Sequence, residues 1–90
     1  MKKAKVVIKN ETGLHARPAS QFVKKAGEYK SEIKITRDKD EVNAISIMGV
    51  MSLGAEKGSE IIIEAEGEDE DTAIAELVNY LENVLPAEDE

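Results

Sequence analysis

The chain has 90 residues, of which 41% are hydrophobic and 34% charged, so it suits one compact domain and excludes a disordered chain. It has no cysteine, which excludes disulfides and thiolate metal sites, and it has no apolar segment long enough to cross a bilayer or act as a leader. The net charge of −7 argues against direct binding of nucleic acid, and we expect a cytoplasmic monomer with no membrane insertion.

The first 27 residues predict a strand, a loop and a helix. Apolar residues at positions 4, 6 and 8 alternate with residues 5, 7 and 9, which is typical of a half-buried strand. A loop follows at 10–15, and a helix at 16–26 has Pro18 in its first turn and Gly27 after its end. Its apolar face consists of Ala19, Phe22, Val23 and Ala26.

The middle of the chain predicts a hairpin, a short helix and a last strand. Ile33 and Ile35 alternate with polar residues in a strand at 32–37, and the polar turn 38–40 leads to a third strand at 41–44. A short helix at 46–53 ends at Gly54. The fourth strand covers 60–66, with its apolar positions again in alternation.

The C-terminal part predicts a long helix at 72–85. Acidic residues at 68–71 precede its positive N-terminal end, and Pro86 helps to end it. Its apolar stripe consists of Ile74, Leu77, Val78, Leu81 and Val84. We therefore expect a single domain over 1–86 and a short acidic tail at 87–90 that frays.

The element order β-α-β-β-α-β-α predicts an α+β fold. Four half-buried strands and three amphipathic helices fit an open-faced two-layer β-sandwich. In this arrangement a four-stranded antiparallel sheet is covered on one face by the three helices.

His15, the only histidine, is predicted at or beside the N-cap of the first helix. The first N–H groups of a helix have no internal partners and the helix dipole adds positive charge there, so this place attracts anions. A neutral imidazole nitrogen can attack phosphorus. The amides of Ala16 and Arg17, together with the Arg17 guanidinium, would then bind the phosphoryl oxygens.

The rest of the chain suggests a carrier rather than an enzyme. It has no Walker-type glycine-rich loop, no acidic pair spaced for magnesium beside His15, and no general base next to it in the sequence. One histidine without further ligands rarely makes a metal site, so we expect neither a metal nor a cofactor.

Ser46 begins an unusual short helix that contains Ile47, Met48 and Met51. Ser46 suits an N-cap, and a phosphate on its hydroxyl would also lie at a helix N-terminus. The apolar residues fit two interpretations equally. They either fill the core under the sheet or form an exposed, adaptable surface for partners.

Two segments, Thr12–Ala19 and Ser46–Gly54, resemble the active-site and regulatory-serine segments of the HPr family of phosphocarriers, and the resemblance extends from Lys5 to about Leu85. It implies that enzyme I, charged by phosphoenolpyruvate, phosphorylates His15 with help from Arg17, and that a sugar-specific enzyme IIA receives the group. It also implies phosphorylation of Ser46 by HPr kinase/phosphorylase and binding of the seryl-phosphorylated form to a LacI-type catabolite-control repressor. The implied partner surface consists of Lys24, Ile47, Met48 and Met51.

Other functions fit the same residues. One is a purely regulatory HPr-like module switched at Ser46, although a class of relatives with that role lacks the histidine that this chain has. Another is a carrier of a nitrogen-related or dihydroxyacetone-related phosphotransfer branch. Ile45 departs from the polar or basic residue that many relatives have before the serine, which bears on recognition by the kinase and the repressor.

Overall fold

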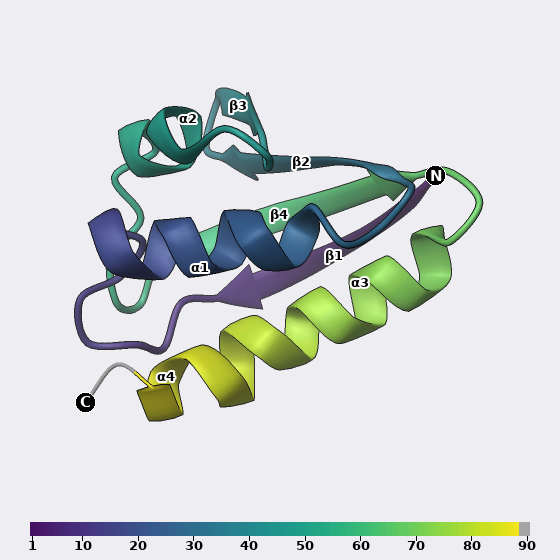
Figure 1. The fold of residues 1–90 in the computed structure, drawn as a ribbon. Helices are drawn as coiled ribbons and strands as arrows, with labels where there is room; N and C mark the ends of the chain where they lie inside the picture. The colour runs from purple at the N-terminus through teal and green to yellow at the C-terminus, as the bar shows by residue number, and fades with distance from the viewer. Residues whose placement is uncertain (89–90) are drawn as a thin grey trace.

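The computed structural model describes residues 1–88, which form two layers (Figure 1). The sheet contains β1 (Lys2–Val7), β2 (Glu32–Arg37), β3 (Asp40–Asn43) and β4 (Glu60–Glu66). The helical layer contains α1 (Ala16–Ala26), α2 (Ile47–Ser52), α3 (Glu70–Asn79), the π-helical segment η1 (Tyr80–Val84) and α4 (Leu85–Glu88). The helices cover one face of the sheet, with α3, η1 and α4 forming one continuous helical rod (Figure 1). This confirms the predicted open-faced α+β sandwich.

The sheet has the order β1-β4-β2-β3, and every neighbouring pair is antiparallel. The first and last strands are therefore side by side, with Val6 opposite Ile61. On the other side of β4, Ile63 lies opposite Ile35 of β2. Because side chains alternate between faces, this register puts these isoleucines and Val6 on the same, helix-covered face.

The core lies between the sheet and the helices. Val6, Ile33 and Ile61 face inward from the strands, while Phe22 of α1 and Leu77 of α3 meet them from the helices, and all are buried. The outer face of the sheet is charged instead, with exposed ion pairs that join Lys3 to Glu64, Lys5 to Glu60 and Lys34 to Glu41. The alternation read in the sequence thus corresponds to one dry and one solvated face.

β1 runs from Lys2 to Val7 rather than over the predicted positions 4–9, and two short elements also differ slightly from their predicted bounds. β3 begins at Asp40, one residue before the predicted start, because a two-residue turn allows Arg37 to pair with Asp40. Asp38 in this turn has a left-handed φ of 56°. α2 runs from Ile47 to Ser52, with Ser46 as its N-cap.

The predicted end of the long helix at Pro86 is wrong. The chain remains helical through Pro86 to Glu88, and the preceding turn widens so that the Leu85 N–H donates to the Tyr80 carbonyl five residues back. Pro86 has no N–H and its ring crowds the carbonyl four residues earlier, so a wide turn accommodates it inside a helix. The same turn brings Leu85 into the core, while Val84 of the predicted stripe is only half-buried.

Both ends of this helical rod differ from the prediction. It begins at Glu70, two residues before the predicted start, after Asp69 as N-cap. Ala87 and Glu88, assigned to a fraying tail, continue the helix, and the last two residues of that tail lie outside the described residues. In the described part of the chain, no helix has the length and apolar character to cross a membrane.

Candidate functional site

His15 is the N-cap of α1, as predicted, with an extended backbone (φ −82°, ψ −169°) and an exposed side chain. Its carbonyl accepts the Ala19 N–H at 2.8 Å, which closes the first turn. Pro18 has no N–H, so the first turn has two N–H groups left, those of Ala16 and Arg17. Among the described residues neither has a hydrogen-bond acceptor. The imidazole therefore stands beside two donors that are available to an anion.

The loop before His15 is held by its own backbone and by a distant segment. The buried Asn10 side chain donates from Nδ2 to the Gly13 carbonyl at 2.6 Å, and the Gly13 N–H donates to the Asn10 carbonyl at 3.1 Å. Leu14 is only 2% exposed, and its N–H donates to the carbonyl of Ala55 at 2.9 Å. The residue directly before His15 is thus anchored in the core and to the chain that follows α2.

Gly13 allows this loop to lie close to the 55–56 segment. Its φ is +66°, a left-handed conformation that favours glycine. A Cβ at this position would lie 2.4 Å from the Ala55 carbonyl oxygen and 2.7 Å from the Glu56 Cα. Both the backbone angle and the lack of space therefore require glycine two residues before His15.

Arg17 adds charge to the two free donors. It is exposed on the first turn of α1, and no ion pair engages it among residues 1–88. Its guanidinium is therefore available for a charge-assisted contact with an anion held at His15. Such a cluster can stabilise a dianion on the imidazole without enclosing it, so the group can leave again.

Ser46 forms the N-cap of α2, as predicted, and is exposed. Its Oγ accepts the Gly49 N–H at 3.1 Å. A Cβ on Gly49 would lie 3.2 Å from that Oγ and 3.3 Å from the Val42 Cβ, so the absent side chain leaves room for the cap. The hydroxyl is thus accessible to solvent at the positive end of a short helix.

The structure decides between the two interpretations of the apolar residues beside Ser46. Met48 is 81% exposed, and Ile47 and Met51 are about half as exposed, whereas Val50 of the same helix is buried. We call these three residues the α2 apolar surface. Because α2 packs beside α1, which bears His15 and the exposed Lys24, this surface and the histidine belong to adjoining elements (Figure 1).

Sequence reasoning missed Arg37 and Asn10 as residues that shape this site. Arg37 donates from Nη1 to the carbonyls of Leu53 at 2.8 Å and Gly54 at 3.2 Å, directly before Ala55. Its position, two residues after Ile35 in a strand that alternates, would have predicted an inward-facing cation. Asn10 carries no comparable signal, because its burial depends on the loop's tertiary contacts.

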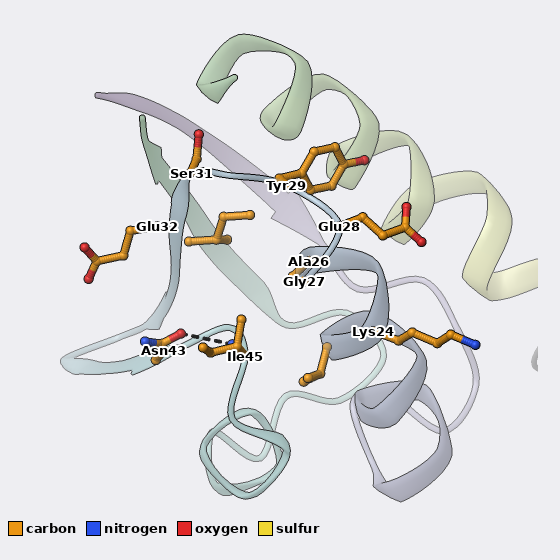
Figure 2. A pocket seen from close by; sticks show the side chains of 11 residues that line it. Lys24, Ala26, Gly27, Glu28, Tyr29, Ser31, Glu32, Asn43 and Ile45 are labelled. Atoms are coloured by element: carbon orange, nitrogen blue, oxygen red, sulfur yellow. Dashed lines mark hydrogen bonds between the residues drawn. The ribbon is translucent and has the colours of Figure 1, made fainter. Parts of the chain in front are cut away.

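A cleft of about 610 Å³ lies at the other end of α1, away from His15 (Figure 2). Val23, Ala26, Ile33 and Ile45 give it apolar walls, and Ile45 is 61% exposed at its edge. In Figure 2 the Lys24 side chain extends away from this cleft. Lys24 is itself one of the lining residues, but His15, Ala16 and Arg17 are not among them, so the cleft is separate from the start of α1.

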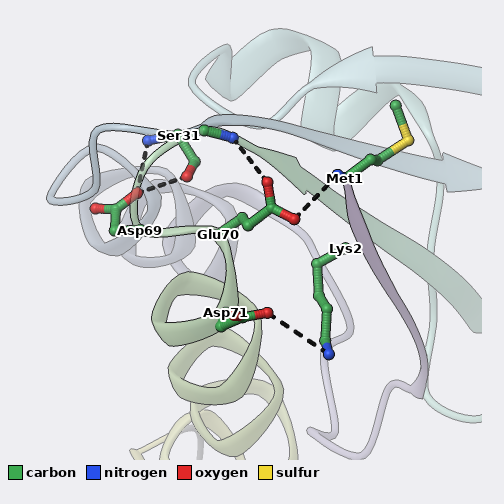
Figure 3. Close-up of polar contacts among 7 residues, drawn as sticks. Met1, Lys2, Ser31, Asp69, Glu70 and Asp71 are labelled. Carbon is green, nitrogen blue, oxygen red and sulfur yellow. Dashed lines mark hydrogen bonds and ion pairs between the residues drawn. The ribbon is translucent and has the colours of Figure 1, made fainter.

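Polar contacts at the opposite end of the sheet perturb two carboxyls (Figure 3). Hydrogen bonds from the Ser31 hydroxyl and the Lys30 N–H lower the pKa of Asp69. A hydrogen bond from the terminal ammonium of Met1 lowers the pKa of Glu70. Within residues 1–88 no group of three or more histidine or acidic side chains is arranged to hold a metal ion.

The chain is similar to known proteins over most of its length. The family model described as "PTS HPr component phosphorylation site" matches residues 2–83. The phosphocarrier protein HPr of Borreliella burgdorferi is 46% identical over 92% of this chain and 96% of that protein. The HPr-like protein Crh of Bacillus subtilis is 43% identical over 91% and 96%.

Solved structures of similar proteins have the same fold. HPr from Thermoanaerobacter tengcongensis, 48% identical, has been solved as HPr-C-His with a TM-score of 0.90 over 94% of this chain and 96% of that one. It has also been solved as a dimer, with a TM-score of 0.74 over 94% and 98%.

Proposed function

The chain belongs to the HPr family of phosphotransferase-system phosphocarriers, and on this premise we propose that His15 is its phosphoryl acceptor. The observation that carries the proposal is the exposed imidazole at the N-cap of α1, next to the unengaged N–H groups of Ala16 and Arg17. The donor is enzyme I charged by phosphoenolpyruvate, and the acceptor is a sugar-specific enzyme IIA.

Transfer requires one displacement at phosphorus. The unprotonated imidazole nitrogen attacks, an N–P bond forms, and the bond between phosphorus and the donor breaks with its electron pair staying on the donor. The two amides and the Arg17 guanidinium then bind oxygens of the phosphoryl group. The next partner reverses this chemistry, so the carrier has no turnover of its own.

The α2 apolar surface and Lys24 provide the contact area for partners in this proposal. Exposed methionine adapts to differently shaped partners, and a carrier must meet at least a donor and an acceptor. Lys24 and Arg17 place positive charge on exposed positions of α1 in a chain of net charge −7, which favours approach of an acidic surface.

A second candidate function is regulation through phosphorylation of Ser46, and the similarity to proteins named Crh favours it. In this proposal HPr kinase/phosphorylase modifies the exposed Ser46 hydroxyl, and the modified protein binds a LacI-type repressor. A phosphate at this place would put two negative charges beside the α2 apolar surface, hindering acidic partners and favouring basic ones.

One crossed experiment tests both candidates. With phosphoenolpyruvate and enzyme I, the wild-type chain should gain one acid-labile, base-stable phosphate, and His15→Ala none. Because the chain has a single histidine, mass spectrometry and acid lability assign the site without ambiguity. With ATP and the kinase, the wild-type chain should gain an acid-stable phosphate, and Ser46→Ala none.

Each variant serves as the control of the other. Ser46→Ala should be labelled by enzyme I as the wild type is, and His15→Ala should be labelled by the kinase. Purified phosphohistidine protein should then lose its label to an enzyme IIA, and a nitrogen-related or dihydroxyacetone-related acceptor that takes it instead would identify the branch. Equal enzyme I labelling of His15→Ala and wild type would reject the carrier proposal.

A further inference from the structure

We propose that Arg37 is a positioning residue for His15, although it lies at the end of β2 and does not touch the histidine. The inference rests on the proposed phosphocarrier function. Arg37 would act through the segment 53–55, which joins the end of α2 to the loop before His15.

Arg37 is placed where its side chain can reach the end of α2. It ends β2, in phase with Ile33 and Ile35, so its side chain starts on the helix-covered face of the sheet. There the guanidinium reaches the end of α2, and Nη1 donates to the carbonyls of Leu53 at 2.8 Å and Gly54 at 3.2 Å. A cation facing the helix layer of a small domain thus has defined acceptors.

Those carbonyls need a hydrogen-bond donor. The last carbonyls of a helix have no partner within it, and the helix dipole makes this end negative. Gly54 turns the chain out of α2 with a φ of +63°, and a Cβ on it would lie 3.6 Å from Arg37 Nη1. Arg37 therefore provides both charge and hydrogen bonds to the point where the chain leaves α2.

A backbone hydrogen bond links the end of this segment to the residue before the histidine. Ala55, directly after Gly54, accepts the Leu14 N–H at 2.9 Å, and Leu14 directly precedes His15. The tight approach of Gly13 to Ala55 leaves the loop little freedom to follow another path. A shift of the 53–55 segment would therefore move the backbone that sets the position of the imidazole.

The chain that follows this segment has its own anchor at residues 58–59. The Ile8 N–H donates to Ser59 at 2.8 Å, and the Gly58 N–H donates to the Ile8 carbonyl at 2.7 Å. Arg37 supplies side-chain hydrogen bonds to the segment 53–55, so its loss would loosen that segment and leave residues 58–59 attached. We therefore expect a folded protein with a less ordered His15 loop.

Hydrogen exchange and phosphorylation kinetics test this inference in Arg37→Met. We expect the Leu14 amide to exchange about tenfold faster than in the wild type, while the amides of β4 keep their protection. We also expect phosphorylation by enzyme I at saturating carrier to slow about tenfold, with a smaller change in the half-saturating concentration, because misplacing a reacting group lowers the transfer rate. Arg37→Lys, which keeps a cationic donor, should recover part of both losses.

Lys39→Met is the matched control, because Lys39 is an exposed cation of the same hairpin with no ion pair among the described residues. It should behave as the wild type in both measurements. Unchanged Leu14 exchange and kinetics in Arg37→Met would overturn the inference, and so would an equal loss of protection at Leu14 and throughout β4. If enzyme I does not label even the wild type, the carrier function fails, while the exchange data still decide whether Arg37 orders the loop.

Discussion

At the scale of single residues, Gly13 and Gly58 both have left-handed backbones. Comparing them distinguishes the cost of backbone strain from the cost of a steric clash. Gly13 (φ +66°) lies against the Ala55 carbonyl, whereas Gly58 (φ +93°) has no atom within 4 Å of where its Cβ would be. Both positions disfavour an L side chain through their backbone angles. Only Gly13 also needs the space, because its loop packs on the backbone that orients Leu14.

Gly13→Ala should therefore lower the free energy of unfolding by about 3 kcal/mol or more, as strain and backbone overlap add. Gly58→Ala should cost only about 1 kcal/mol, from strain alone. Urea unfolding of the two variants at pH 7 measures the difference. Equal losses would mean that the contact with the 55–56 segment relaxes without cost.

At the scale of elements, Asp69 joins the start of α3 to the chain after α1 (Figure 3). Its carboxylate accepts the Ser31 hydroxyl at 2.5 Å, the Lys30 N–H at 2.8 Å and the Ser31 N–H at 2.9 Å. Asp71, two residues further along, makes only an exposed ion pair with Lys2 at 3.5 Å. The first carboxylate is held by three hydrogen bonds, whereas the second makes one exposed ion pair.

Asp69→Asn should lower stability at pH 7 and flatten its dependence on acid pH. The pKa of Asp69 is lowered in the folded state, chiefly by the Ser31 hydroxyl, so the stabilisation is present above the unfolded pKa of about 3.9 and disappears as the pH falls through the folded value. Urea unfolding between pH 7 and pH 2 measures this contribution.

Asp71→Asn is the control for that measurement. It removes the same charge from the same helix end but should change stability little, because exposed ion pairs contribute at most about 1 kcal/mol. If the two variants show the same pH dependence, the hydrogen bonds to Asp69 are not the cause of the acid sensitivity.

At the scale of the whole molecule, stability depends on a small core beneath the exposed α2 apolar surface. Phe22 is the chain's single phenylalanine and is fully buried between helix and sheet, whereas Met48 is 81% exposed. The domain must therefore keep its core intact while it presents large apolar side chains to solvent at α2.

Phe22→Ala should cost about 3–5 kcal/mol in the free energy of unfolding, since it leaves a cavity in place of the largest fully buried side chain of the core. That is a large share of the total of about 5–15 kcal/mol for a domain. Met48→Ala should change stability by only about 0.5 kcal/mol. Thermal and urea unfolding compare them, and a comparable cost for Met48→Ala would show that α2 is supported from outside the core.

Much of the fold could be predicted because its elements depend on local patterns. The bounds of α1, β2 and β4 agree with the prediction, since each carries a regular apolar period between turn residues. The end of the long helix could not, because Pro86 usually ends a helix and only the packing of Leu81 and Leu85 makes the wide turn favourable. Local propensity yielded there to tertiary contacts.

The sequence by itself determined that a single histidine begins a helix and that a serine caps another, because a cap is defined by residues close together in the chain. Only the tertiary structure decided that Met48 is exposed and that the Leu14 N–H donates to Ala55. The same is true of the hydrogen bond from Arg37 to the Leu53 carbonyl. Those contacts join residues 16 to 41 positions apart, and such distances are set by how the helices pack on the sheet rather than by any local period.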